Sequence, residues 1–390
     1  MSVEVVSLGC RLNLTESEVI RALLAGERDV VVVNSCAVTS EAVRQTRQAI
    51  RKARRARPDA RLLVTGCAAE IEREAIAAMP EVDGLVANAR KLDPRAWNVS
   101  QSRQAAPQRH TRAFVAVQTG CDHACTFCVI PQGRGPSRSL GVAAVLREVE
   151  RHLAHGASEV VLTGVDVTSW GHDLPGCPAL GRLVRAILEA FPRLRRLRMS
   201  SLDGVEIDSE LFELLAGEAR VMPHLHLSLQ HGHDLILKRM KRRHSRGDAL
   251  ALLERLRARR PDIAIGADLI AGFPTEDEAM HAANRSIIRE LGVVHGHIFP
   301  YSPRPGTPAA RMPQLGKATI RHRAAELRME AAAMRRQWLL GLIGSELSVL
   351  AEADGTGHAA NFARVALPAG TPRGAIVTVV PNGLEEGLLR

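Results

Sequence analysis

Aromatic residues, lysines and long apolar runs are all scarce in this chain. Phe, Trp and Tyr make up 3% of its 390 residues, too little for rows of aromatic rings that stack on nucleic-acid bases. No apolar run reaches the roughly 18 residues of a transmembrane helix, and the first residues, MSVEVVSLGC, lack the charged start and long apolar core of a secretory signal. The sequence therefore predicts a cytoplasmic protein with no membrane partner, in a compartment where thiols stay reduced.

The scarcity of lysine makes arginine the main source of positive charge. Lys and Arg together number 52, but the only lysines are Lys52, Lys91, Lys238, Lys241 and Lys317. The formal net charge is +10. Arginine suits phosphate oxygens, so this composition favours a nucleic-acid partner. Arginines that merely cover solvated faces in a GC-rich genome explain the same charge, and that alternative stays open.

Seven cysteines occur, and three of them crowd into one short loop. Cys121, Cys125 and Cys128 form a C-x3-C-x2-C pattern. Most iron–sulfur clusters take four cysteines, so three thiolates on a four-iron cube leave one iron open to a substrate or cosubstrate. A zinc site with His123 would need four ligands from eight residues, and disulfides need an oxidising compartment. We favour the open cluster.

This loop, with Phe127 before its last cysteine, resembles the signature of the radical S-adenosylmethionine (SAM) enzymes. In that family the amino and carboxylate groups of SAM chelate the open iron. The resemblance implies a SAM-binding [4Fe–4S] cluster on the three cysteines and places Phe127 beside SAM.

The first 92 residues repeat one unit: an apolar run, a cysteine-bearing turn and a helical stretch. The expected strands are 3–8, 29–33 and 61–64, the helices 16–24, 40–57 and 70–79, and the turn cysteines Cys10, Cys36 and Cys67. Continuous β-branched runs predict buried parallel strands, whose carboxyl ends meet at one edge of a sheet. The three cysteines should converge there and hold a second [4Fe–4S] cluster, again with an open iron.

Three segments make the resemblance more specific. They are Leu-Gly-Cys-Arg-Leu-Asn (8–13), Asn-Ser-Cys-Ala-Val-Thr (34–39) and Thr-Gly-Cys-Ala-Ala-Glu (65–70). With the 121–128 loop they resemble the methylthiotransferases over nearly the whole chain. That family joins an N-terminal three-cysteine domain, a radical SAM domain and a small RNA-binding TRAM domain. The expected domains are 1–92, 113–335 and 336–390, with a polar linker at 93–112.

The central part alternates strands and helices. Strands are expected at 113–118, 159–163, 195–200, 224–229, 263–269 and 294–299, and helices include 141–155, 179–191 and 248–260. The fold class is therefore α/β, with a partial (β/α)6 barrel, as the resemblance also implies. Sites on such barrels lie at the carboxyl ends of the strands, and the three-cysteine loop follows the first strand.

Several strand ends carry candidate SAM contacts. By the resemblance, Gly164 and Asp166 belong to the segment that receives the SAM amino group, Ser201 touches the ribose or methionine part, and the strand with Asp268 passes close to the adenine.

The run 224–230 alternates strictly, so its polar residues should face the cavity and its leucines should face outward. Gln230 joins the candidates for SAM contact. A His-x-His metal site at His224 and His226 is the alternative, which the resemblance disfavours. The following residues depart from the family pattern, so no role is assigned to His231 or His233.

Basic residues gather in two places that are candidates for RNA contact, with a solvated charged surface as the alternative at each. One is the predicted helix 40–57 and the other the run 238–244; the candidates are Arg47, Arg51, Arg54, Lys238, Lys241, Arg242 and Arg243.

A helix is expected at 317–340, followed by short alternating runs separated by turns with Gly355, Gly370 and Gly383. This pattern predicts a small β-barrel. By position it resembles the TRAM domain.

The resemblance implies a methylthiotransferase with two [4Fe–4S] clusters. One SAM methylates sulfur held at the first cluster. A second SAM is cleaved to a 5′-deoxyadenosyl radical, which activates a C–H bond so that a methylthio group replaces the hydrogen. A reduced flavodoxin or ferredoxin must supply electrons, and the enzyme is expected to be a monomer.

Three branches of the family compete: they modify isopentenyladenosine in tRNA, threonylcarbamoyladenosine in tRNA, or an aspartate of a ribosomal protein. Segments 8–13 and 134–139 resemble the threonylcarbamoyladenosine branch most. The predicted reaction is replacement of the C2 hydrogen of N6-threonylcarbamoyladenosine next to the anticodon. An alternative of another class is a non-catalytic iron–sulfur protein that binds RNA and does not cleave SAM.

Overall fold

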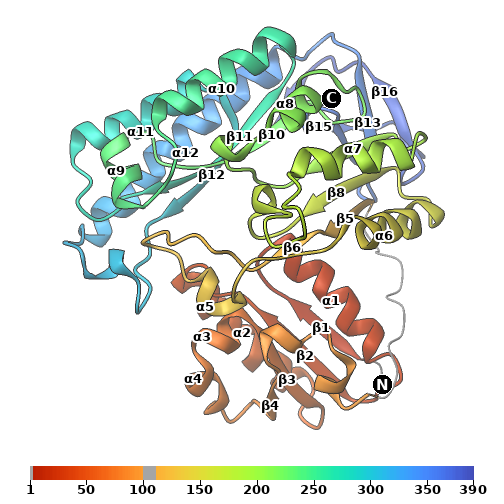
Figure 1. The fold of residues 1–390 in the computed structure, drawn as a ribbon, viewed down its shortest axis with the longest axis vertical. Coiled ribbons are helices and arrows are strands. Elements are labelled where there is room, and N and C mark those ends of the chain that lie inside the picture. Colours follow the sequence, from red (N-terminus) through yellow and green to blue (C-terminus); the bar gives the residue numbers. More distant parts are fainter. Residues whose placement is uncertain (1–2, 100–110) are drawn as a thin grey trace.

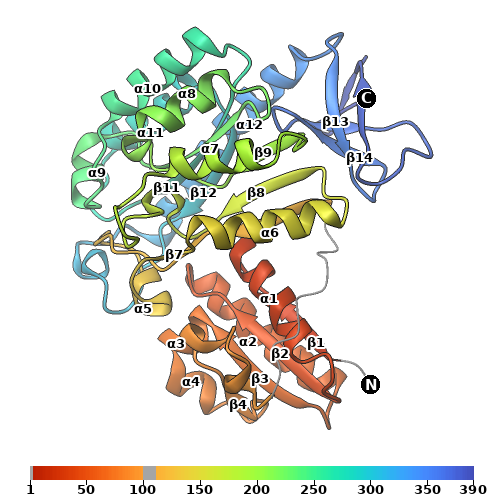
Figure 2. The same cartoon turned by 45° about the vertical axis from the view of Figure 1, so that its right-hand side comes forward.

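The chain folds into three successive parts, described over residues 3–99 and 111–390 in a computed structural model. A parallel sheet near the N-terminus lies below a larger central α/β part, and a small sheet at the C-terminus lies on the far side of the central part (Figures 1 and 2). Most of the expected linker, residues 100–110, lies outside the described residues. No helix in the described ranges has the length and apolar character needed to cross a membrane.

The N-terminal sheet is parallel, in the order β1-β2-β3-β4. Its strands are β1 (Glu4–Ser7), β2 (Val30–Ser35), β3 (Arg61–Gly66) and β4 (Gly84–Leu85), and its helices are α1 (Arg11–Leu23), α2 (Ser40–Ala56), α3 (Cys67–Ile71) and α4 (Arg73–Ala77). All of β2 is buried between helices on both faces. Thr39 caps α2 by accepting a hydrogen bond from the N–H of Ala42 (3.1 Å).

Two helix predictions were wrong in their bounds. Helix α1 begins at Arg11, directly after Cys10, instead of at residue 16. The Asn13 side chain donates to the carbonyls of Leu8 and Ser35 (2.7 and 2.9 Å), which holds the first turn against two strand ends. The predicted helix 70–79 is two short helices, α3 and α4, divided at Glu72.

Six parallel strands form the open barrel of the central part. They are β5 (Arg112–Ala116), β8 (Glu159–Thr163), β9 (Arg196–Met199), β10 (His224–Gln230), β11 (Ala264–Ala271) and β12 (Val293–Pro300). Strands β5-β8-β9 and β10-β11-β12 form two sheets, and parallel bridges Leu197–Val221 and Leu202–Leu227 join them. Within the described residues β5 and β12 do not pair, so the barrel is open on one side.

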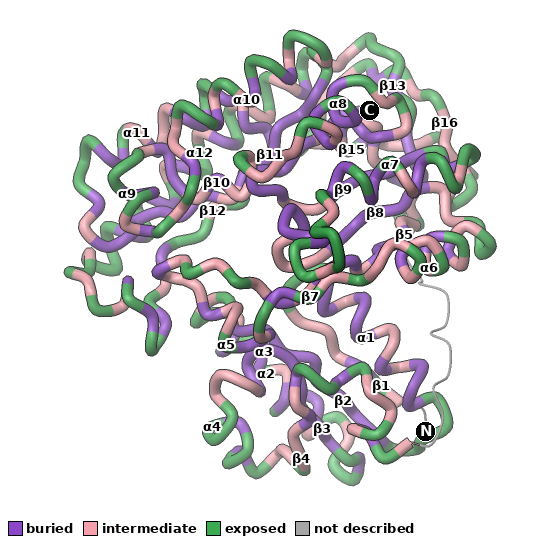
Figure 3. The backbone as a smooth tube through the Cα atoms, in the orientation of Figure 1, coloured by how far each residue is buried: buried purple, intermediate pink, exposed green. Residues whose placement is uncertain are grey.

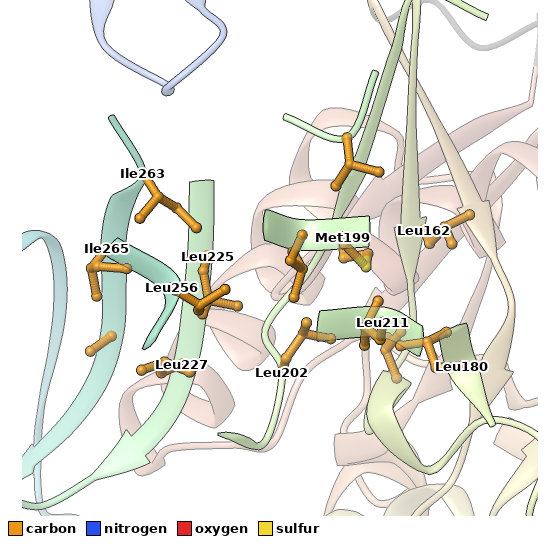
Figure 4. Packing of buried hydrophobic residues seen from close by; sticks show 14 of the residues in the cluster. Leu162, Leu180, Met199, Leu202, Leu211, Leu225, Leu227, Leu256, Ile263 and Ile265 are labelled. Atoms are coloured by element: carbon orange, nitrogen blue, oxygen red, sulfur yellow. The ribbon is translucent and has the colours of Figure 1, made fainter. Parts of the chain in front are cut away.

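Helices cover the outside of this barrel. They are α6 (Val142–Ala154), α7 (Leu180–Ala190), α8 (Ser209–Gly217), α9 (Asp234–Arg239), α10 (Arg246–Arg259) and α11 (Glu278–Glu290). The main core lies between these helices and the strands, where Leu225 and Leu227 pack with Leu256 of α10 (Figure 4). The buried segments follow the strands, while the outer turns of the helices are exposed (Figure 3). The expected outward packing of the leucines is confirmed.

A long helix, α12 (Lys317–Leu340), runs along β12 and leads into the C-terminal sheet. The expected domain boundary at 335/336 therefore falls inside a helix. The sheet has the order β16-β13-β14-β15-β18-β17. Its strands are β13 (Leu347–Ala351), β14 (Thr356–Ala359), β15 (Arg364–Ala366), β16 (Ile376–Val379), β17 (Leu384–Glu385) and β18 (Leu388–Leu389).

One aromatic side chain of the C-terminal part closes the floor of the barrel. The ring of Phe362 lies 5.1 Å from the ring of His224 and 5.6 Å from that of His295, which come from β10 and β12. The guanidinium groups of Arg112 and Arg198, from β5 and β9, lie 5.1 and 4.9 Å from its centre. Four barrel strands thus meet on one ring.

Glu276 is the centre of a buried charge cluster after β11. Its carboxylate accepts hydrogen bonds from two backbone N–H groups of the turn (3.0 and 3.2 Å) and from Arg323 (3.1 Å), and His231 lies 3.2 Å away. Burial alone would raise the pKa of Glu276, but His231, His281 and Arg323 outweigh burial and lower it to about 2. The cluster fixes the turn that connects β11 to α11, and it gives His231 a structural contact.

Folding stability is expected to fall as the pH drops from about 4.5 towards 2. In that range the unfolded Glu276 carboxyl group binds a proton and the folded one does not, so the full contribution is present above pH 4.5. The loss should be about 3 kcal/mol in the free energy of unfolding. Urea unfolding of iron-free protein measures it. The Glu276→Gln variant should be less stable at neutral pH and lack this acid-dependent component; equal acid dependence in both proteins would contradict the assignment.

Candidate functional site

A cavity of about 1010 Å³ is lined by the strand-end loops of the N-terminal sheet and by the barrel interior. Cys10 and Cys36 line it from one side, and Cys121, Cys125 and Cys128 line it from the other. Cys67 is buried behind the wall. The carboxyl ends of the N-terminal strands and those of the barrel strands therefore face one shared space.

The loop with Cys121, Cys125 and Cys128 follows β6 (Gln118–Thr119) and ends in helix α5 (Ile130–Arg134). Distant parts of the chain hold the loop through Thr126. Its N–H donates to the carbonyl of Met240 (3.1 Å), its hydroxyl donates to the carbonyl of Arg239 (2.8 Å), and its carbonyl accepts from the N–H of Ala309 (2.9 Å). The three thiols are thus fixed before any ligand binds.

Two of these thiols, Cys121 and Cys128, hold their protons more tightly than a free cysteine does. Burial, with smaller contributions from Asp166 and the neighbouring thiols, raises the pKa of Cys121 to about 12. Burial likewise raises the pKa of Cys128 to about 11. One guanidinium N–H of Arg242 lies against Cys125, with Nη1 3.7 Å from Sγ, and supplies positive charge. Three preformed thiols beside a cation fit an iron–sulfur cluster with one open iron.

The other three cysteines follow β1, β2 and β3 in turn, as the strand pattern predicts. Gly9 has a φ of +88°, and a Cβ there would lie 2.6 Å from Sγ of Cys36. Glycine therefore lets the first strand end approach the second thiol. Burial raises the pKa of both Cys36 and Cys67.

Buried positive charge lies beside these thiols. Lys91 and Arg134 both pair with Glu16, at 2.5 and 2.8 Å, and the side chains of all three are at most 7% exposed. Two cations with one carboxylate leave an excess positive charge. Cys67 lies close enough to interact electrostatically with both Lys91 and Arg134. An uncompensated buried cation is costly, so the site suits an anionic group such as a thiolate-bound cluster.

Helix α5 lies between the central part and the N-terminal sheet, beside α3 (Figure 1). Asn88, next to Cys67, donates from its side chain to the carbonyl of Gly133, and Arg134 donates to the side chain of Asn13 (2.6 Å). The helix directly after Cys128 therefore packs on the strand ends that carry Cys10 and Cys67. No feature of the local sequence around Arg134 signals this contact.

The six predicted SAM contacts all line the cavity: Phe127, Gly164, Asp166, Ser201, Gln230 and Asp268. Asp166 lies nearest to the cysteine loop, with its Oδ2 2.8 Å from Nε2 of His123 and 3.6 Å from Sγ of Cys121. Hydrogen bonding to Asp166 and Glu206 raises the pKa of His123 to about 10. Asp166 and Glu206 are therefore carboxylates that share a cationic imidazole.

Asp268 lies further into the barrel and binds two histidines. Its Oδ1 accepts from Nε2 of His226 (3.0 Å) and from Nδ1 of His297 (3.1 Å). Gly266 makes room for the His226 ring, because any Cβ at that glycine would overlap the ring. The polar face of β10 lines the cavity as predicted. The ring of His226 lies 4.6 Å from that of His297 and 6.3 Å from that of His224.

The predicted RNA contacts divide into paired and exposed residues. Arg47 and Arg51 pair with Glu72 and Glu81, at 2.7 and 3.8 Å. Arg54 pairs with Asp83 (2.6 Å) and donates to three backbone carbonyls, which ties α2 to neighbouring loops.

Residues of the second basic run, 238–244, differ in exposure and in charge pairing. The Arg242 side chain is 8% exposed, pairs with Asp203 (2.8 Å) and lines the cavity. Lys238, Lys241 and Arg243 are exposed, although Arg243 also pairs with Glu206 (2.5 Å).

Sequence reasoning missed several residues that line the cavity or lie beside it. Asp203 and Glu206 follow β9, and polar residues after a parallel strand are a usable signal for a site. His123 lies inside the cysteine loop and was weighed only as a zinc ligand. Arg134 and Arg242 find their partners more than a hundred and about forty residues away, respectively, so no local pattern announces them.

Two family models match the chain. The Radical SAM superfamily matches residues 115–285, and a family described as uncharacterized protein family UPF0004 matches residues 2–87. The two matches cover the cysteine loop with the first five barrel strands and the N-terminal sheet.

Similar known proteins span most of the chain. The threonylcarbamoyladenosine tRNA methylthiotransferase MtaB of Rickettsia prowazekii is 42% identical over 99% of this chain and 96% of its own length. MtaB of Bacillus subtilis is 33% identical over 78% of this chain and 74% of its own. A tRNA-2-methylthio-N(6)-dimethylallyladenosine synthase of Cereibacter sphaeroides is 34% identical over 89% and 86%.

A solved structure shares the fold. The radical SAM methyltransferase TsrM from Kitasatospora setae is similar with a TM-score of 0.54 and 17% identity, over 77% of this chain and 69% of that one. With the strand order, this likeness confirms the fold class predicted from the sequence.

Proposed function

Because this chain belongs to the radical SAM methylthiotransferases, we propose that it replaces the C2 hydrogen of N6-threonylcarbamoyladenosine, next to the anticodon of tRNA, with a methylthio group. The branch rests on the MtaB relatives, which are named for this nucleoside and include the relative with 42% identity. The aspartate of a ribosomal protein and isopentenyladenosine are the competing substrates.

We further propose that the chain holds two [4Fe–4S] clusters. Cys10, Cys36 and Cys67 would ligate the first. Cys121, Cys125 and Cys128 would ligate the second, which binds SAM. The single observation that carries this proposal is that five of the six thiols line one cavity, while α5 packs on α3, the helix that begins at the sixth, Cys67. When bound, the clusters and SAM supply the transferable sulfur, the methyl group and the 5′-deoxyadenosyl radical.

The chain's own residues hold and enclose these groups. Phe127, Gly164 and Asp166 lie by the cysteine loop, where the carboxylate of Asp166 would accept hydrogen bonds from the SAM amino group. Ser201, Gln230 and Asp268 line the remaining wall. Ser201 and Asp268 lie within 3.4 Å of each other and present oxygens to the ribose or adenine. The barrel core and Phe362 keep bulk water from the other end of the cavity.

Substitution Asp166→Asn is expected to raise the KM for SAM about 10- to 100-fold, because it removes a charged hydrogen-bond partner. Formation of 5′-deoxyadenosine at increasing SAM concentration measures it, and the iron content should stay at the wild-type level. Asp173→Asn is the matched control, since Asp173 is exposed and does not line the cavity. An unchanged KM in Asp166→Asn would contradict the contact.

The remaining parts of the proposal concern partners. The exposed cations Lys238, Lys241 and Arg243 would contact tRNA phosphates, and Arg47 and Arg51 would do so where their own acidic partners leave an edge free. A reduced flavodoxin or ferredoxin would donate electrons to a cytoplasmic monomer. The domains would be 1–92, 113–335 and 336–390, the last two sharing α12.

Nucleoside mass spectrometry of tRNA from a deletion strain tests the substrate. Loss of 2-methylthio-N6-threonylcarbamoyladenosine is expected, and its persistence would refute the proposed branch.

Anaerobically reconstituted protein should contain about eight irons per chain; about four would refute the two-cluster proposal. With reductant and SAM it should form 5′-deoxyadenosine, and a non-catalytic RNA-binding protein would form none.

A further inference from the structure

Two arginines of α12 face the cavity beside the last barrel strand. Both Arg328 and Arg335 line the cavity. Arg335 donates from Nη1 to Nδ1 of His295 (3.2 Å), and Arg328 donates from Nη2 to the carbonyl of Ile298 (3.3 Å). Arg335 is half-buried and Arg328 is exposed at the rim. The two side chains therefore occupy successive levels of one wall, along the open edge of the barrel.

Arg328 and Arg335 differ from other arginines of the cavity in their charge pairing. Among the described residues, no carboxylate lies within ion-pair distance of Arg328 or Arg335, whereas two other cavity arginines are paired: Arg198 with Glu159 (3.1 Å) and Arg242 with Asp203 (2.8 Å). Burial and the charge of Arg335 lower the pKa of His295 to about 3. His295 is therefore a neutral acceptor that orients the guanidinium without neutralising it. A partly buried cation in this position favours an anionic ligand.

The position of Arg335 separates it from the cysteine loop. Ile320, in the first turn of α12, packs on Gly272 at the carboxyl end of β11. A Cβ on that glycine would touch the Ile320 side chain. Arg335 lies about four turns further along, roughly 22 Å at 1.5 Å per residue. An anion on Arg335 is therefore distinct from the SAM groups that would bind at Cys121, Cys125 and Cys128.

We propose that Arg335, with Arg328 at the rim, binds the carboxylate of the threonylcarbamoyl group and so selects this nucleoside over its isopentenyl counterpart. The inference rests on the proposed function and specifies how its substrate is recognised. The planar guanidinium matches a carboxylate with two parallel hydrogen bonds. The carboxylate and the reacting C2 belong to one modified base, so both must enter the same cavity. An isopentenyl group offers no charge to pair with the partly buried guanidinium of Arg335, and this mismatch disfavours it.

Binding of three anticodon stem-loop RNAs to the full-length reconstituted enzyme tests the proposal. The RNAs carry N6-threonylcarbamoyladenosine, its threonyl methyl ester or unmodified adenosine. Wild-type enzyme should bind the acid about 10- to 100-fold more tightly than the ester. Arg335→Gln should lose that factor for the acid and leave the ester unchanged. Arg335→Lys should lose less, because it keeps the charge without the planar fork.

Arg336→Gln is the matched control, since Arg336 neighbours Arg335 on the same helix but is exposed outside the cavity. Its affinities should equal those of the wild type. Wild-type enzyme that binds acid and ester equally would overturn the proposal, whatever the fate of the variants. Equal weakening of all three RNAs by Arg335→Gln would also overturn it and indicate a phosphate contact. Preference for the acid without methylthio transfer would refute the proposed function and keep this inference.

Discussion

Methylthio transfer is expected to fall to background in a Cys36→Ala variant that still cleaves SAM. Cys36 would ligate only the first cluster, and its loss leaves the loop of Cys121, Cys125 and Cys128 intact. Removing a group that only orients a metal ligand costs roughly 10- to 100-fold, so loss of the ligand itself should cost more. Alanine keeps the backbone at this buried strand end and adds no charge.

Two products measured in one reaction check this prediction. Formation of 5′-deoxyadenosine should stay within about twofold of wild type, and the iron content should fall by about half. Cys125→Ala should lose both products. Cys177→Ala is the control, because Cys177 is exposed in a separate loop and has no expected ligand role. Retained methylthio transfer in Cys36→Ala would rule out the first cluster as the source of sulfur.

Substitution Arg134→Met should lower the free energy of unfolding by about 2–3 kcal/mol, because it removes the buried hydrogen bonds of a charged group to Glu16 and Asn13. The side chains of Arg134, Glu16 and Lys91 are 4%, 7% and 2% exposed. The double variant with Glu16→Gln should lose more stability than Arg134→Met alone, since it leaves Lys91 as a buried cation without a carboxylate partner. Urea unfolding of the full chain measures both.

Arg185→Met provides the comparison, since Arg185 also pairs with a glutamate, Glu210, but at the surface. Its effect should stay below about 1 kcal/mol. Because Arg134 joins α5 to α1, Arg134→Met should also lower methylthio transfer more than SAM cleavage. Equal stability losses in the buried and the exposed pair would show that Arg134 does not hold the two parts together.

The strands and the six cysteines were predictable because each is encoded locally. A buried parallel strand needs a continuous apolar run, and β2 has four consecutive valines, Val30–Val33, all buried. The carboxyl ends of such strands meet by geometry, so Cys10, Cys36 and Cys67 could be brought together without knowing any contact. The bounds of α1 were not predictable, because the side chain of Asn13 fixes its first turn through carbonyls on two strand ends.

The partners of charged residues that lie far apart in the sequence could not be predicted. Arg54 and Arg242 were both predicted to be RNA-contacting residues, because a run of basic residues does not indicate which carboxylates or carbonyls its members bind. The structure ties Arg54 to carbonyls of neighbouring loops and turns Arg242 into the cavity towards Asp203 and Cys125. The unpaired state of Arg335 was equally hidden, because it depends on which carboxylates the other helices use.

Through the ring of Phe362, the small C-terminal sheet also covers the floor of the barrel, apart from any contact it makes with RNA. A radical generated in the cavity would be quenched by any small reductant or by oxygen that reached it through the floor of the barrel. A side chain outside the barrel's own sequence covers that floor, so the floor stays uncovered until the last part of the chain has folded against it. Because synthesis ends at the C-terminus, this cover of the barrel floor forms only when the chain is nearly complete.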